Sequence, residues 1–185
     1  MKAKVTLPPK RTLAGFTLIE LMTVLAVATI LLSIGIPSFR ALLQNLRITS
    51  TANGFFAAMN LTRSEALKRG MPVHLSTVDG GIDWSKGWVV FVDSNGTGQL
   101  DEGDEVIFKR DQIPNGMTID PKFTSKTVKY LTYNGSGRTQ INGSNSAPQA
   151  GSFLITLDNQ IERKIVINFL GRARVCNPLT ESATC

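Results

Sequence analysis

Residues 15–39, GFTLIELMTVLAVATILLSIGIPSF, decide how this chain is organised. From residue 16 to residue 39 the stretch holds 24 residues and a single charged side chain, Glu20. A helix of about 20 apolar residues spans the hydrocarbon core of a bilayer, which is about 30 Å thick. The stretch therefore predicts a membrane-spanning helix over residues 16–39.

Basic residues upstream predict the orientation of this helix. They are Lys2, Lys4, Lys10 and Arg11. Positively charged residues next to a membrane-spanning helix stay in the cytoplasm, so residues 70–185 are expected in the periplasm or outside the cell. An ordinary signal peptide would have a shorter apolar core. An ordinary anchor would not explain Glu20, because an ionisable group in an apolar span costs roughly a few kcal/mol without a partner.

The junction after Gly15 carries a family resemblance. Residues 15–21, GFTLIEL, resemble the class III signal of type IV pilins and type II secretion pseudopilins. The resemblance implies that a prepilin peptidase removes residues 1–15 and that the new terminus, Phe16, is N-methylated. It also implies that Glu20 pairs with the terminal amine of a neighbouring subunit during filament assembly. Two charges in hydrocarbon are tolerated when they neutralise each other.

Removal of the leader changes the charge balance. The whole chain has a formal net charge of +6, and four of its cations precede Gly15, so residues 16–185 carry only +2. A surplus of this size is typical of a solvated surface and does not by itself indicate an anionic partner.

The helix is predicted to continue past Pro37 to residue 69. Pro37 matches a helix-kinking proline of the same families and removes one backbone hydrogen bond. Over residues 40–69, apolar side chains recur at three- and four-residue steps, which predicts an amphipathic segment packed on a sheet. Gly70 followed by Pro72 ends the helix.

Beyond Gly70 the pattern changes to short β-rich runs with a period of two, separated by Asn, Asp and Gly turn signals. The expected strands are 73–78, 88–93, 105–110, 128–133, 152–158 and 163–170, the last extending in one alternative to 175. We therefore predict an α+β, type IV pilin-like fold, in which a long N-terminal helix packs on antiparallel sheet and residues 70–185 form the globular domain.

Later motifs narrow the resemblance. They are RSEA at 63–66, GWVVFVD at 87–93, DEVI at 104–107 and GRARVC at 171–176. Together they resemble the GspH/FimT family of minor pilins and pseudopilins. This implies a subunit that starts in the inner membrane with one span and a periplasmic domain, then joins other pilins in a filament. We expect a minor pilin that initiates or caps a type IV pilus. The alternative is a GspH-like pseudopilin of a type II secretion system.

Arg172 and Arg174 are the leading candidates for ligand binding. At alternate strand positions they would point to one face, and paired guanidiniums suit phosphates. Members of the FimT branch are implicated in DNA uptake through a Gly-Arg-x-Arg motif, which residues 171–174 match, so the resemblance implies binding of double-stranded DNA in natural transformation. The alternative is a structural pair, or one that contacts an acidic neighbouring subunit. Six cations would enlarge the patch if folding gathers them: Lys122, Lys126, Lys129, Arg138, Arg163 and Lys164.

The two cysteines, Cys176 and Cys185, lie in the last ten residues. Two cysteines alone are too few for a zinc site. Outside the cytoplasm we expect them to form a disulfide that closes the C-terminal tail, the alternative being two free thiols.

The acidic segment 93–104 superficially resembles a calcium-binding loop. Asp93, Asn95, Thr97, Gln99 and Asp104 fall at loop positions one, three, five, seven and twelve. The usual final glutamate is replaced by Asp104, and no paired helices flank the segment. An acidic hairpin turn is therefore the favoured interpretation, with calcium binding as the alternative.

No set of residues indicates an enzyme. His74 is the only histidine, and no Ser/His/Asp or Cys/His set and no phosphate loop accompanies it. We expect His74 to be an ordinary strand residue, and we expect no cofactor. Trp84 and Trp88 are expected in core or hairpin packing, with base stacking as the alternative.

Overall fold

The computed structural model describes residues 15–142, 146–158, 161–181 and 185. The chain divides into two compact units, Met1–Ala41 and Leu42–Cys185. The predicted leader, apart from Gly15, and part of the polar loop that follows residue 142 lie outside the described residues.

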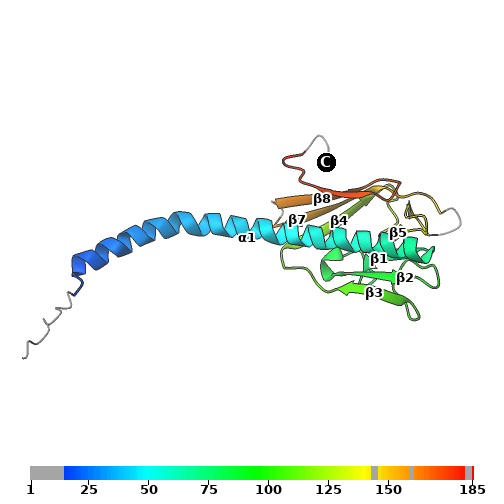
Figure 1. The fold of residues 1–185 in the computed structure, drawn as a ribbon, viewed down its shortest axis with the longest axis horizontal. Coiled ribbons are helices and arrows are strands. Elements are labelled where there is room, and N and C mark those ends of the chain that lie inside the picture. The colour runs from blue at the N-terminus through cyan, green and yellow to red at the C-terminus, as the bar shows by residue number, and fades with distance from the viewer. Residues whose placement is uncertain (1–14, 143–145, 159–160, 182–184) are drawn as a thin grey trace, which may run out of the picture. The chain divides into compact units, whose positions relative to one another are not determined.

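One helix, α1 (Leu18–Arg69), begins in the first unit and ends in the second (Figure 1). Its start is capped by Thr17, whose Oγ1 accepts a hydrogen bond from the backbone N–H of Glu20 at 3.3 Å. Threonine followed three residues later by glutamate is the sequence signature of this cap. The helix continues through Pro37.

The first unit presents an apolar helix surface. Its most apolar 18-residue window has a mean hydropathy of 2.3 and no buried residue, so by length and composition α1 can cross a membrane. Hydroxyl groups in this unit form hydrogen bonds within the helix: those of Thr29 and Ser33 each donate to a helix carbonyl at 2.7 Å. Such internal bonds allow hydroxyls to sit among apolar side chains.

The second part of α1 buries one face. Its buried residues are Ile48, Thr51, Ala52, Phe55, Ala58, Met59, Thr62 and Ala66. The helix ends at Gly70, which has a φ of +67° and whose N–H donates to the Ala66 carbonyl at 2.9 Å. Glycine enters this left-handed conformation without a Cβ clash, which makes it a good helix terminator.

Two antiparallel sheets make up the rest of the second unit. Sheet A has the order β3-β2-β1-β5-β6, with β1 (Val73–Thr77), β2 (Trp88–Val92), β3 (Glu105–Arg110), β5 (Leu131–Tyr133) and β6 (Thr139–Gln140). Sheet B has the order β4-β7-β8-β9, with β4 (Met117–Phe123), β7 (Gly151–Leu157), β8 (Ile161–Ile167) and β9 (Ala173–Cys176). A short 3-10 helix, η1 (Trp84–Lys86), precedes β2.

The core lies where α1 meets both sheets, which flank its second part in Figure 1. Phe55 of the helix is fully buried and makes edge-to-face contacts with Trp84, Trp88 and Phe153, at ring-centroid distances of 5.4, 4.9 and 4.7 Å. Aromatic pairs in this geometry add to the free energy of plain burial. The predicted α+β, pilin-like fold of one long helix on antiparallel sheets is confirmed.

Strand β4 was missing from the sequence-based expectation. Residues 117–123 alternate inward and outward side chains, with Met117 and Ile119 in the core and Thr118 and Asp120 exposed. Pro121 interrupts the run, and proline weakens a strand prediction because it cannot donate a ladder hydrogen bond. The structure accommodates it because β4 is an edge strand of sheet B.

Three further expectations are corrected. The expected strand 128–133 pairs only over Leu131–Tyr133, and β6 was not foreseen. The expected strand 163–170, with its extension to 175, is instead a hairpin of β8 and β9. Its turn is made by Asn168, whose backbone N–H bonds the Arg172 carbonyl at 3.2 Å and whose carbonyl accepts from the Gly171 N–H at 2.9 Å.

Candidate functional site

Arg174 lies in β9, an edge strand of sheet B, and Arg172 immediately precedes that strand. Both are exposed, whereas the intervening Ala173 and the following Val175 pack against the core. Arg172 stands in the turn just before the strand, but the alternation still places both guanidiniums on the outer side. Within the described part of the chain, no ion pair or side-chain hydrogen bond holds either guanidinium.

The turn before Arg172 is held rigidly. The Asn168 Oδ1 accepts hydrogen bonds from the N–H groups of Leu170 and Arg172, at 3.1 and 2.9 Å. Gly171 has a φ of +74°, and a Cβ placed there would lie 2.3 Å from the Gly137 carbonyl oxygen. Only glycine fits so closely against a neighbouring backbone. The glycine of the Gly-Arg-x-Arg segment therefore has a packing role.

Only two of the six additional cations come near the arginine pair: Arg138 lies beside the β8–β9 turn, and Lys164 of β8 stands on the same face of sheet B as Arg174. Lys122, Lys126 and Lys129 line a separate hollow of about 350 Å³ beside the end of β4. The Arg163 guanidinium donates to Thr49 Oγ1 of α1 at 3.3 Å, on the helix side of sheet B. Arg138 lines another hollow, together with Phe169 and Leu170 of the β8–β9 turn.

Lys164 is engaged by the C-terminal tail. Its Nζ donates to the backbone oxygen of Cys185 at 2.7 Å. Cys185 is joined by a disulfide to Cys176, with 5.8 Å between the Cα atoms, as predicted. The register places Cys176 directly opposite Lys164, so the disulfide and the lysine together close the tail onto β8 and β9.

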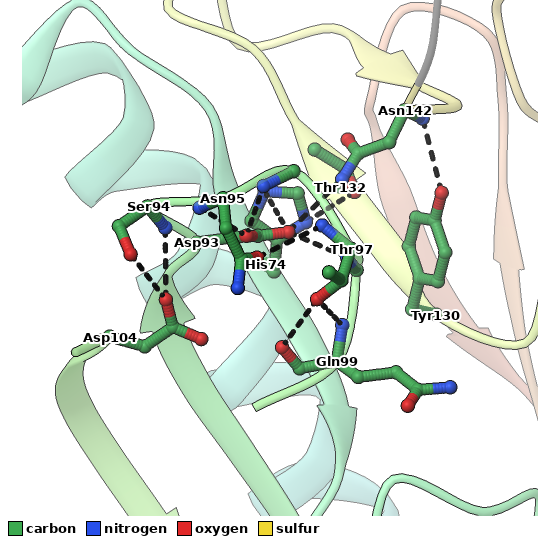
Figure 2. A network of polar contacts seen from close by, with 12 residues as sticks. His74, Asp93, Ser94, Asn95, Thr97, Gln99, Asp104, Tyr130, Thr132 and Asn142 are labelled. Carbon is green, nitrogen blue, oxygen red and sulfur yellow. Dashed lines mark hydrogen bonds and ion pairs between the residues drawn. The ribbon is translucent and has the colours of Figure 1, made fainter. Parts of the chain in front are cut away.

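The acidic β2–β3 loop is organised by its own backbone (Figure 2). The buried Asp93 carboxylate accepts from the N–H groups of Gly96 and Gly98, both at 2.6 Å. The Asp104 carboxylate accepts from the N–H groups of Ser94 and Asp101, both at 2.9 Å. These oxygens are thus occupied by N–H donors, and in the described residues no cluster of three or more His, Cys, Asp or Glu residues is able to hold a metal. The loop is thus an acidic turn held by its own backbone hydrogen bonds, and calcium binding stays the alternative prediction.

Figure 2 also places His74 beneath this loop. Its Nδ1 is 2.8 Å from the Thr132 Oγ1, and its Nε2 is 3.8 Å from the Asp93 Oδ2. The ring is 2 % exposed and lies 5.5 Å from that of Phe91. Burial lowers the pKa of His74 from 6.5 to about 4, against the opposing influence of the Asp93 and Asp104 carboxylates. His74 is a neutral packing residue of β1, as expected.

This burial predicts an acid-dependent loss of stability. The folded chain resists protonation of His74 until about pH 4, whereas the unfolded chain accepts a proton below 6.5. The His74 contribution is therefore complete above pH 6.5 and falls as the pH drops to about 4. At about 1.4 kcal/mol per pKa unit, the loss is about 3 kcal/mol. We expect the free energy of unfolding of His74→Gln, measured by urea titration, to vary less between pH 7 and 4 than that of wild type. An equal change in the free energy of unfolding of the two proteins between pH 7 and 4 would contradict this.

Trp84 and Trp88 are both fully buried. Each packs on Phe55, and the Arg110 guanidinium covers the Trp88 ring at 5.1 Å. Core packing is therefore correct, and base stacking by either tryptophan is excluded. The aromatic ring nearest the arginine pair in sequence is Phe169, which sequence reasoning did not single out. Only its exposure in the folded chain distinguishes it.

The candidate processing residues belong to the first unit. Gly15 and Phe16 precede α1, and Phe16 is 83 % exposed. Glu20 lies in the first helical turn, where a carboxylate is also favoured by the helix dipole.

Comparison with known families identifies the chain. A profile described as type II transport protein GspH matches residues 51–171. The chain belongs to the GspH family. A prokaryotic N-terminal methylation motif also matches, over residues 10–36. Comparison with curated protein sequences finds no match.

Solved structures show the same fold. The type IV minor pilin FimU of Pseudomonas aeruginosa matches with a TM-score of 0.59 and 20 % identity, over 74 % of this GspH-family chain and 92 % of FimU. The minor pseudopilin EpsH from the type 2 secretion system of Vibrio cholerae matches with a TM-score of 0.51 and 15 % identity, over 71 % and 98 %. At these identities the likeness describes the fold alone.

The GspH profile and the N-terminal methylation motif together make the chain a minor pilin or pseudopilin, a structural, non-enzymatic subunit. The family implies processing by prepilin peptidase and assembly with other pilins. The apolar N-terminal helix is consistent with anchoring in the inner membrane before assembly.

Proposed function

We propose that the chain is a minor pilin of a type IV pilus, located near the filament's initiating end or tip, and that Arg172 and Arg174 bind DNA for uptake. The observation that carries the DNA-binding proposal is the exposure of two guanidiniums, two residues apart, that no described carboxylate neutralises. Uncompensated arginines on one strand edge suit the regularly spaced phosphates of a nucleic acid backbone.

The proposal includes the chemistry of assembly. Prepilin peptidase cleaves between Gly15 and Phe16, and Phe16 becomes the methylated terminus. Glu20 then neutralises the terminal amine of a neighbouring subunit within the apolar filament core, where an unpaired charge is costly. Pro37 leaves one helix carbonyl without its usual N–H donor and introduces a bend. The match of residues 10–36 to the methylation motif supports these roles.

DNA binding is tested on the full chain purified in non-ionic detergent. We expect Arg172→Gln with Arg174→Gln to weaken DNA affinity roughly 10-fold and to reduce the slope of log K against log salt by about 1.8, because two phosphate contacts disappear. The matched control is Lys68→Gln with Lys109→Gln, which removes the same charge from exposed positions on α1 and β3. Equal effects of the two double variants would show nonspecific attraction. Unchanged affinity of the arginine variant would leave a contact with a neighbouring subunit as the explanation.

The alternative is a pseudopilin of a type II secretion system, favoured by the description of the matching family and by the likeness to EpsH. A deletion strain scored separately for surface pili, DNA uptake and secretion distinguishes the two. We expect loss of pili and uptake, with pili but not uptake restored by the double arginine variant. Loss of secretion alone would establish the pseudopilin.

A further inference from the structure

Phe169 and Leu170 form an exposed apolar tip on the β8–β9 turn. Their side chains are 52 % and 50 % exposed. The turn beneath them is fixed by the Asn168 Oδ1, and the Arg63 guanidinium of α1 donates to the Leu170 carbonyl at 3.5 Å. The turn that carries the Phe169 ring is therefore held in place by hydrogen bonds.

The surroundings of this tip are cationic and polar. Phe169 and Leu170 line a hollow of about 310 Å³ together with Arg138 and Pro148. No carboxylate is found among the described residues that line it. Arg172 and Arg174 follow directly in the chain, both exposed. The volume is near the lower end of the range for small-ligand sites, about 300–1,000 Å³.

Phe169 shares its hollow with Arg138, and two further exposed arginines follow three and five residues along the chain. Single-stranded nucleic acid is bound by such a combination, because bases stack on an exposed ring while cations hold the phosphates. The apolar face attracts the flat base and the guanidiniums attract the anionic backbone. A closed duplex offers the phosphates but keeps its bases stacked on one another. The charge around the tip argues against an occupant that is itself cationic.

We propose that Phe169 stacks on an unpaired base while Arg138, Arg172 and Arg174 hold the adjacent phosphates, so that the site prefers single-stranded DNA and frayed ends to closed duplex. This inference rests on the DNA binding proposed above and specifies its substrate class. It also assigns the stacking role, which the buried tryptophans are unable to fill, to a residue of the arginine-bearing turn.

Affinity measurements on the full chain in detergent test the proposal. The probes are a 12-nucleotide oligothymidine and a covalently closed circular duplex, which has neither ends nor loops of unpaired bases. We expect Phe169→Ala to weaken binding of the single strand by roughly 5- to 100-fold and binding of the duplex by less than about 2-fold. Phe169→Leu, which keeps an apolar side chain without a ring, is expected to behave like Phe169→Ala. The control Phe108→Ala removes a partly exposed ring from β3 in the other sheet and is expected to change neither affinity.

A spectroscopic variant reports stacking directly. Phe169→Trp adds an exposed indole to a chain whose own tryptophans, Trp84 and Trp88, are both buried. An exposed indole emits at a longer wavelength than a buried one, so the emission of the new residue can be separated. Oligothymidine is expected to quench this emission, whereas heparin, which supplies anionic charge without bases, is expected not to. Quenching by both would overturn the proposal.

The outcomes separate the two claims. If the arginine double variant no longer binds either DNA probe while Phe169→Ala binds both with unchanged affinity, the DNA-binding proposal is supported and base stacking is wrong. If Phe169→Ala weakens both probes equally, the ring acts as a general contact and the strand preference is wrong. If wild type binds neither probe, both claims are wrong, and the tip is then a contact for another subunit.

Discussion

Gly171→Ala is expected to lower the free energy of unfolding of the second unit by about 3 kcal/mol. A residue with a Cβ at a φ of +74° loses about 1 kcal/mol or more through backbone strain. The new Cβ would also lie 2.3 Å from the Gly137 carbonyl oxygen and 2.8 Å from the Tyr133 ring. Relieving such overlap displaces well-packed atoms and typically costs a further 1–3 kcal/mol or so.

Gly96→Ala is the matched control. Gly96 has a similar φ of +80°, but a Cβ there meets nothing within 4 Å. We expect it to cost only the strain of about 1 kcal/mol. Urea unfolding followed by the fluorescence of the buried tryptophans measures both variants. Equal losses would show that the contact between the two turns is unimportant. A larger loss for Gly171→Ala would show that the close packing of Gly171 against the Gly137 carbonyl stabilises the second unit.

Phe55→Ala is expected to destabilise the second unit by about 3–5 kcal/mol, the range for removing a large buried side chain. Phe55 is fully buried and is the helix residue that contacts Trp84, Trp88 and Phe153 together. Its removal leaves a cavity between α1 and both sheets, which the surrounding rings fill incompletely.

Phe169→Ala provides the comparison for this core variant. Phe169 is half exposed, so its removal is expected to change the free energy of unfolding by only about 0.5 kcal/mol. Denaturation midpoints of the two variants, compared at equal slope, measure the difference. A loss below about 1 kcal/mol for Phe55→Ala would show that the core repacks and that the aromatic cluster is not what joins helix and sheets. The same measurement establishes that Phe169→Ala is folded for the DNA experiments.

The helix and the first three strands were accessible from sequence because their signals are local. The helix carries its apolar span and its terminating Gly70 as local signals. Strands β1, β2 and β3 are marked by dense β-branched and aromatic residues between turn signals. β4 was missed because Pro121 is acceptable only at a sheet edge, and which strand forms the edge depends on partners distant in the chain.

The candidate sites divide in the same way. The processing residues around Gly15, the arginine pair and the disulfide followed from short motifs and from the compartment. The carboxylates of Asp93 and Asp104 resembled calcium ligands by spacing, but the folded loop supplies N–H donors to their oxygens. Spacing describes where ligands stand in the chain and does not reveal which donors a turn brings to them.

Local patterns were thus sufficient to predict an apolar span, the long helix and its packing on antiparallel sheet, because each depends on residues close together in the chain. The leader junction stays a prediction that rests on the resemblance of residues 15–21. The grouping of the cations was not predictable in this way. Sheet pairing placed Arg172 and Arg174 together on an edge, turned Arg163 toward the helix and separated the three lysines beside β4. It also buried both tryptophans and exposed Phe169, because side-chain exposure depends on which distant segment packs against each face.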